Sequence, residues 1–293
     1  MYRMATANGS PRARALAAAL RQARNDRGIS ARQLANKLSI DQALLSRIET
    51  GKRIADVETT ARILGALGTA SAECERILDI ARHANEPNWL TTGVPGIPQQ
   101  LAGAVASERD ASVIMEWSPM IIPGLLQTND YVRGVAQADG HPKHDVESRV
   151  MVRVSRREIL TKRNPVHYEV LVGDVALRQQ IGSNVAMIDQ LRYLIKFCAE
   201  NSNVTLRVVP IRTGWHPGTA GPFVLYEFPD APPYVHFEHY SSSAFVTDSD
   251  DVDAYRKALD MIGEYALSPS KSIDLIAQTI VEEHQEDEPE ILA

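Results

Sequence analysis

The stretch from Ser30 to Arg53, SARQLANKLSIDQALLSRIETGKR, constrains the fold more than any other part of this 293-residue chain. Ser30 and Gln33 have the spacing of a reciprocal capping box, which starts one helix, and Asp41 is placed to cap another that runs to Gly51. Small and apolar residues recur at the spacing that packs two helices at a steep angle across a short turn: Leu34, Ala35, Leu38, Ile40, Leu45 and Ile48. The stretch therefore predicts two short helices that cross closely at Ala35.

Three further helices are predicted on either side of this pair. Leu16 and Leu20 lie on one face of a first helix that stops at Gly28, a residue suited to the left-handed backbone beyond a helix end. Asp56 and Ser71 are placed to cap a fourth and a fifth helix. Residues 1–85 are therefore expected to form a five-helix domain.

The charges of the chain are segregated between its two parts. Residues 1–85 contain 14 Lys and Arg against 8 Asp and Glu, a net charge of +6, whereas residues 86–293 have a net charge of −12. A uniform globule mixes its charges, but a nucleic-acid-binding module joined to an acidic domain separates them. The first part is therefore a candidate for binding phosphate.

The outward face of the third helix is polar and small. Its side chains suit the edges of bases in a major groove, with amide, methyl, hydroxyl and guanidinium groups in turn at Gln42, Ala43, Ser46 and Arg47. Basic and amide side chains nearby are assigned to the DNA backbone: Arg32, Gln33, Lys52 and Arg53. The predicted site is therefore a recognition helix flanked by phosphate contacts.

The second part reads as an α+β domain. Three prolines and two glycines near NEPNWLTTGVPGIPQQ indicate a linker at 86–98, followed by a domain over 99–285 and an acidic tail over 286–293. A helix is expected near 99–112, followed by a buried apolar segment. Strands are predicted at 166–175, 203–211, 222–229 and 234–248, with a helix at 184–201 and two closing helices, of which Ser268 caps the last. This order favours a small sheet covered on one face, with flanking helices.

Catalytic and metal chemistry find little support in the sequence. The candidate groups of the second part are His216, His236 and Glu238 on one strand face, His239 on the other, and the serines at 241–243. They match no GxSxG, HExxH, GxGxxG or GxxxxGK[ST] motif, so we expect no enzyme activity, no metal and no cofactor. The basic helix at 144–163 is interpreted as a solvated face rather than an anion site.

Cysteine use and hydropathy bear on the compartment. Cys74 and Cys198 are 124 positions apart, without metal-ligand spacing, so both are expected to be buried, reduced thiols. The first twenty residues lack a secretory signal, and no window approaches 18 consecutive apolar residues. These observations predict a cytoplasmic protein without membrane contact.

The stretch ISARQLANKLSIDQALLSRIETGKRIADVETTARILGAL resembles the five-helix lambda-repressor-like (XRE-type) helix-turn-helix family, whose second motif helix enters the major groove. Two departures are Ser39, where the family has a turn glycine, and Ala31, where it commonly has a phosphate-anchoring glutamine. The segments IIPGLLQTNDYVRG, RVSRREILTK and VLVGDVALRQQIG are similar to the second domain of actinobacterial regulators of the WhiJ-like, Scr1 antitoxin-like group. The resemblance implies a homodimeric transcriptional regulator that is often paired with a small partner protein.

The helix pattern, the charge segregation and the resemblance together predict a sequence-specific regulator that binds a double-stranded DNA operator. Its second domain is expected to bind a small partner protein or ligand that changes operator binding. An alternative is an antitoxin-like protein that chiefly neutralises a small protein, with DNA binding secondary. A third is an enzyme fused to a targeting module, which turnover by residues 99–293 alone would favour.

Overall fold

The computed structural model describes residues 11–84, 89–92, 107–238 and 242–286. Its packing divides the chain into two compact units. The first unit comprises Met1–Ala111 with Tyr226–Val252, and the second comprises Ser112–Leu225 with Asp253–Ala293. The limits 1–85, 86–98, 99–285 and 286–293 stay a prediction.

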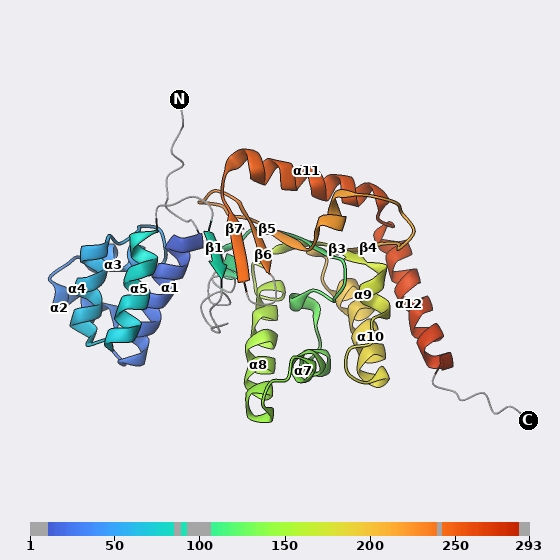
Figure 1. The fold of residues 1–293 in the computed structure, drawn as a ribbon, viewed down its shortest axis with the longest axis horizontal. Coiled ribbons are helices and arrows are strands. Elements are labelled where there is room, and N and C mark those ends of the chain that lie inside the picture. Colours follow the sequence, from blue (N-terminus) through green and yellow to red (C-terminus); the bar gives the residue numbers. More distant parts are fainter. Residues whose placement is uncertain (1–10, 85–88, 93–106, 239–241, 287–293) are drawn as a thin grey trace, which may run out of the picture. The chain divides into compact units, whose positions relative to one another are not determined.

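Five helices make up the amino-terminal part of the first unit (Figure 1). They are α1 (Pro11–Asp26), α2 (Ala31–Leu38), α3 (Gln42–Glu49), α4 (Val57–Leu67) and α5 (Ser71–Arg82). Each contributes side chains to one buried cluster, including Leu20, Leu34, Leu45, Ile63 and Ile77, all 0 or 1% exposed. The five-helix prediction is confirmed, and the periodic apolar residues are those that form its core.

Two details of these helices differ from the prediction. Helix α3 ends at Glu49 rather than at Gly51, because Thr50 leaves helical geometry and Gly51 has a positive φ of 71°. Helix α5 begins at Ser71 itself, with Ala70 at the capping position and no side-chain cap. Ser71 therefore lies one residue too late to be the cap.

The rest of the first unit contains antiparallel strands. Strand β7 (Ser242–Val246) pairs with β6 (Tyr234–Glu238) and with β1 (Trp89–Thr92), which lies inside the segment predicted as a linker. On α1, Arg14 forms an ion pair of 2.5 Å with Asp110, and its guanidinium lies 3.9 Å from the centre of the Phe228 ring. Arg14 is only 6% exposed, whereas the Asp110 side chain is 54% exposed, so the ion pair lies where the interior meets the surface.

The second unit is built on parallel strands. Strand β3 (His167–Gly173) pairs with β2 (Val113–Ser118) on one side and with β4 (Val204–Val209) on the other. With β5 (Phe223–Glu227), the sheet has the strand order β1-β7-β6-β5-β2-β3-β4. The mixed sheet confirms the α+β prediction, whereas the sequence predicts only a buried apolar segment where the structure has β2.

Helical crossovers connect the parallel strands, as parallel pairing requires. Between β2 and β3 lie η1 (Gly124–Leu126), α7 (Asn129–Ala138), α8 (Lys143–Arg156) and η2 (Arg157–Leu160). Between β3 and β4 lie α9 (Asp174–Arg178) and α10 (Asn184–Glu200), and η3 (Pro217–Ala220) precedes β5. The chain closes with α11 (Ser249–Tyr265) and α12 (Pro269–Glu286), and Ser268 accepts the backbone N–H of Lys271 as predicted.

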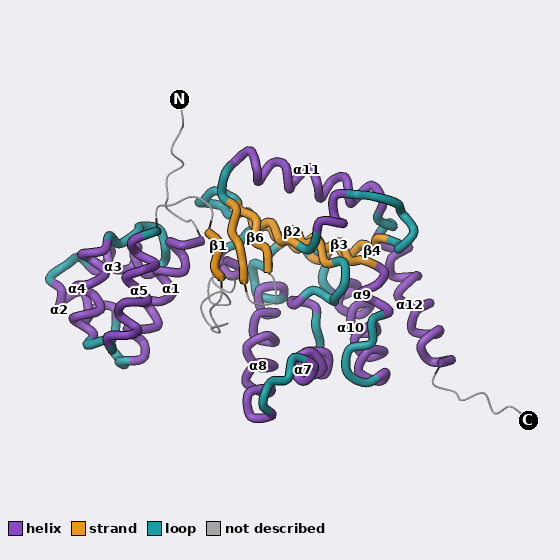
Figure 2. Tube along the Cα trace, viewed as in Figure 1, coloured by secondary structure: helices purple, strands orange, loops and turns teal. Residues whose placement is uncertain are grey.

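The two faces of the parallel strands are covered differently. Tyr168, Val172 and Val208 are fully buried, and by strand alternation they share the face opposite the one that carries Glu169, Leu171 and Arg207. Helix α11 crosses the latter face (Figure 2). There Met115, Leu171 and Thr205 stay half-buried, so the coverage by α11 is incomplete.

Some predictions fall on parts that are not described. Of the helix expected near 99–112, only residues 107–110 are described as helical, and 93–106 lie outside the described residues. The acidic tail beyond Glu286, together with His239 and the serine at 241, also lies outside them.

Candidate nucleic-acid interface

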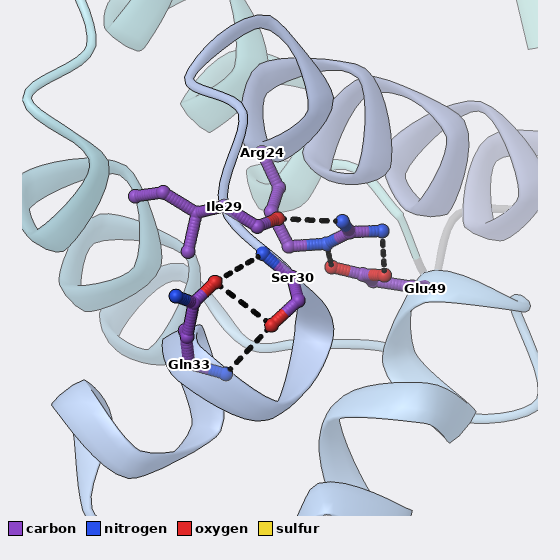
Figure 3. Close-up of polar contacts among 5 residues, drawn as sticks. All are labelled: Arg24, Ile29, Ser30, Gln33 and Glu49. Atoms are coloured by element: carbon purple, nitrogen blue, oxygen red, sulfur yellow. Dashed lines mark hydrogen bonds and ion pairs between the residues drawn. The ribbon is translucent and has the colours of Figure 1, made fainter.

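Helix α2 begins with the reciprocal capping box expected from the sequence (Figure 3). The backbone N–H of Gln33 donates to Ser30 Oγ at 3.2 Å, and Gln33 Oε1 accepts from the Ser30 backbone N–H at 2.9 Å. The Ser30 hydroxyl also donates to Gln33 Oε1 at 2.9 Å. These bonds occupy the amide oxygen of Gln33, and its amide nitrogen is directed away from Ser30.

The turn after α2 depends on Ser39. This residue has φ 52° and ψ 44°, and among the described residues it is the only one other than glycine with a positive φ. Its backbone N–H donates to Asn36 O at 3.1 Å, and that of Ile40 donates to Ala35 O at 3.0 Å, which closes the end of the helix. Ser39 therefore adopts the left-handed geometry that a glycine would adopt at lower cost.

Helix α3 presents the predicted polar face to solvent. Asp41 caps it by accepting the backbone N–H of Ala43 at 2.9 Å. Leu45 and Ile48 point into the core and are 0% and 2% exposed. The four residues assigned to base reading are all exposed: Gln42, Ala43, Ser46 and Arg47. The structure brings them together on one face of a helix of two turns.

The four residues assigned to the DNA backbone are also exposed: Arg32, Gln33, Lys52 and Arg53. Lys52 and Arg53 lie in the turn after α3, where the backbone N–H of Arg53 donates to Arg47 O at 3.0 Å. This bond fixes the backbone of the basic turn to the last turn of α3. Along the chain, basic side chains therefore occur at both ends of the two-helix motif, Arg32 in α2 and Lys52 and Arg53 after α3.

Sequence reasoning missed the ion pair that supports α3 from behind. Arg24 of α1 donates to Glu49, the last residue of α3, through Nε at 2.7 Å and Nη2 at 2.9 Å (Figure 3). Arg24 Nη1 also donates to Ile29 O at 2.8 Å. The side chains are 13% and 7% exposed. The hydrogen bond to Glu49 raises the pKa of the Arg24 guanidinium.

Among the described candidate groups of the second part, His216 and His236 each have their own surroundings within a different unit. His216 is buried beside Trp117 and Tyr265, with each ring centroid 5.6 Å from that of His216. His236 lies in a different strand, stacked on Phe245 at 4.5 Å. In the described part of the chain, no group of three or more His, Cys, Asp or Glu side chains is arranged to hold a metal ion.

The basic helix and the two thiols have local roles. Arg153 and Arg157 donate to Gln127, through its side-chain oxygen and its backbone carbonyl respectively, and the Arg157 guanidinium lies over Tyr193. Part of the basic helix therefore packs against its own unit and is not solely a solvated face. Cys74 and Cys198 are free, as expected, but each is half-buried rather than buried.

Comparison with known families agrees with this geometry. Residues 15–77 match the family model described as a helix-turn-helix domain, which defines the class of the amino-terminal part. Residues 101–278, more than half of the chain, match the model described as a domain of unknown function (DUF5753), and the chain belongs to that family. No curated protein matches the chain.

Among solved structures, the chain is similar to TrmBL2, an archaeal chromatin protein reported to show a novel mode of DNA binding. The identity is 12% and the TM-score 0.32, over 72% of this chain and 67% of that chain. A similarity at this level carries no argument about function. None of the described helices is long and apolar enough to cross a membrane.

Proposed function

We propose that the chain is a sequence-specific DNA-binding transcriptional regulator that acts as a homodimer. The observation that carries the proposal is the exposed face of α3. Gln42, Ser46 and Arg47 offer donors and acceptors for base edges, and Ala43 offers a methyl contact. Lys52 and Arg53 follow in a turn tied to the same helix, at a place suited to phosphates.

Rigidity supports the base-reading role. A two-turn helix discriminates bases only if its side chains reach the groove from a fixed position. Helix α3 is capped by Asp41 at its start and paired through Glu49 to α1 at its end, and Leu45 and Ile48 pack into the core. Its free face is thus held in place by the rest of the helical domain.

In this proposal the second part acts by binding rather than by catalysis. It receives a small partner protein or ligand, and that event changes operator affinity. A ligand changes operator affinity only if it binds the DNA-competent and incompetent states with different affinity, so the operator changes ligand affinity by the same factor. The coupling free energy is typically about 1 to 3 kcal/mol. The net charge of −12 over residues 86–293 supports this division of labour, because an acidic surface repels phosphate.

The proposal is tested by selecting bound sequences from a random duplex pool with the full chain. A regulator of this kind enriches one motif, and a homodimer enriches two half-sites related by two-fold symmetry. The matched control is Gln42→Ala with Arg47→Ala, which keeps Lys52 and Arg53 and should bind without enriching a motif. A pool that stays random with the unchanged chain contradicts the proposal.

A further inference from the structure

A cavity of about 320 Å³ lies between α11 and the face of the parallel strands that this helix crosses. It is contained within the second unit, since its lining residues come from β2, β3, β4 and α11. Its volume is at the lower end of the range for small-molecule sites. Incomplete coverage of this face has therefore left a space that a small molecule can enter.

The floor of the cavity follows from the strand register. Met115 is opposite Glu169, which is opposite Thr205, and Leu171 is opposite Arg207 in the next row of the same face. Leu259 of α11, 7% exposed, faces this floor. Met115, Leu171 and Leu259 provide an apolar surface, which suits the hydrocarbon body of a ligand.

The walls of the cavity are negatively charged. Asp260 and Glu264 are one helical turn apart on the same side of α11, and Glu169 comes from β3. His167 Nε2 lies 3.0 Å from one carboxylate oxygen of Glu169, and both side chains are exposed. These carboxylates offer a bound cation several acceptors beside the apolar floor.

The one basic residue of the lining is committed elsewhere. Arg207 donates to three backbone carbonyls at the end of α11, those of Gly263, Ala266 and Leu267, at 2.7 to 3.0 Å. The carboxyl end of a helix carries partial negative charge, which offsets the guanidinium. The net field in the cavity is therefore that of the carboxylates.

A glycine keeps the cavity open. Gly263 lies in the last turn of α11, where glycine is a weaker helix former than alanine. It lines the cavity, and a Cβ placed on it meets only Arg207 Nη1, at 3.4 Å. A larger side chain at this position would occupy the space between the helix and the sheet.

We propose that this cavity binds a small organic cation, an amine with an apolar body. The body lies on Met115, Leu171 and Leu259, and the ammonium group is directed to the carboxylates of Glu169, Asp260 and Glu264. An organic anion would be repelled by the same carboxylates, and a neutral molecule would form no ion pair with them. The inference rests on the proposed function, because it identifies the ligand that the second part receives.

The test uses three probes with the same phenylpropyl body: 3-phenylpropylamine, 3-phenylpropanol and 3-phenylpropanoate. Each is titrated into the full chain at pH 7 by calorimetry. We expect the amine to bind, the alcohol to bind about fivefold or more weakly, and the acid not to bind, since each exposed charge pair contributes only modestly. Equal binding of the three probes, tighter binding of the acid or no binding of the amine overturns the proposal.

Variants locate the site. Gly263→Leu fills the cavity and should abolish amine binding, whereas Gly65→Leu is the matched control, because Gly65 is an exposed helical glycine of α4 with open space around it. Gly263→Ala favours the helix and intrudes less, so it should keep the fold and weaken binding. Asp260→Asn with Glu264→Gln should weaken the amine about fivefold and leave the alcohol unchanged. Amine binding that survives Gly263→Leu at full strength overturns the proposal.

Operator binding is measured on the same preparations without any amine. If the chain binds its operator but no amine, the inference fails and the proposed function stands. If the amine binds as predicted but no operator is selected, the cavity is a ligand site and the proposed regulatory function fails.

Discussion

Arg24 and Glu49 join α1 to the end of α3 through two parallel hydrogen bonds of 2.9 and 2.7 Å. The pair is largely shielded from water, with side chains 13% and 7% exposed. Glu49 lies two residues after Arg47, so the pair fixes the end of the helix whose outer face is the candidate reading surface. A charged pair in this position is a supporting element of the interface, although it cannot touch DNA itself.

Glu49→Ala should destabilise the five-helix region by about 3 kcal/mol, because it leaves the Arg24 guanidinium without its charged partner in a shielded position. The measurement is amide hydrogen exchange in α1 and α3. Tryptophan fluorescence is unsuitable, since all three tryptophans lie beyond residue 88. The exchange rate of the amides in these helices should rise by about the same factor as the equilibrium constant for unfolding.

A matched control is Glu73→Ala on α5. Glu73 pairs with Arg76 at 2.5 Å, but the two side chains are 47% and 33% exposed. An exposed pair one turn apart contributes about 0.5 kcal/mol or less. Equal losses of stability in Glu49→Ala and Glu73→Ala would show that the Arg24–Glu49 pair contributes no more than an exposed pair.

Ser39→Gly should stabilise the helical region by about 1 kcal/mol. Ser39 has φ 52°, and a left-handed backbone costs a residue with a Cβ roughly this much relative to glycine. Ala61→Gly in the exposed interior of α4 is the control of opposite sign, with an expected loss of about 1 kcal/mol. Hydrogen exchange reports both, and a loss of protection in Ser39→Gly contradicts the strain argument.

The helical region could be predicted closely because its signals are local. Ser30 and Gln33 are three residues apart, and Leu45 and Ile48 repeat at helical spacing, so capping and burial follow from neighbours in the sequence. The Arg24–Glu49 pair spans 25 positions, and both residues are of types usually found on the surface. No local pattern marks such a pair, because it depends on where α1 and α3 lie in the packed domain.

The sheet was harder to predict where strands are covered on both sides. In β2, Ile114 is buried against one face, while Trp117 is buried on the other, so the alternation typical of a half-exposed strand is absent. The cavity beside Gly263 depends on how α11 crosses the sheet. Sequence reasoning located α11 but had no means of placing it over Glu169 and Leu171.

Cys198 should react slowly with iodoacetamide in the folded chain. Burial raises the pKa of its thiol to about 11, so at pH 8 the folded state holds roughly 200-fold less thiolate than an unfolded chain with a pKa near 8.5. Because the pKa is raised in the folded state, the unfolded chain loses this proton first as the pH rises. The free energy of unfolding therefore falls between about pH 8.5 and pH 11. Alkylation followed by peptide mapping, with the urea-unfolded chain as reference, measures the rate; equal rates contradict the prediction.

The reading face is tested by comparing Arg47→Ala with Lys52→Ala on the selected operator and on random duplex. Both side chains are exposed, and they lie five positions apart, at the last turn of α3 and in the turn beyond it. A guanidinium that bonds a base edge contributes only where that base is present. Arg47→Ala should therefore cost about 1 to 3 kcal/mol on the operator, relax base choice at one position and change random binding little.

Lys52→Ala removes a charge from the turn that is expected to face phosphates. Loss of this charge should weaken binding to the operator and to random DNA by the same factor, because every duplex carries the same phosphates. The salt dependence of binding should fall by about one unit of slope, since one fewer counterion is released. Fluorescence anisotropy at several salt concentrations measures both effects. If Arg47→Ala weakens operator and random DNA equally and lowers the salt slope as Lys52→Ala does, then Arg47 contacts the backbone and base reading must be assigned to Gln42, Ala43 and Ser46.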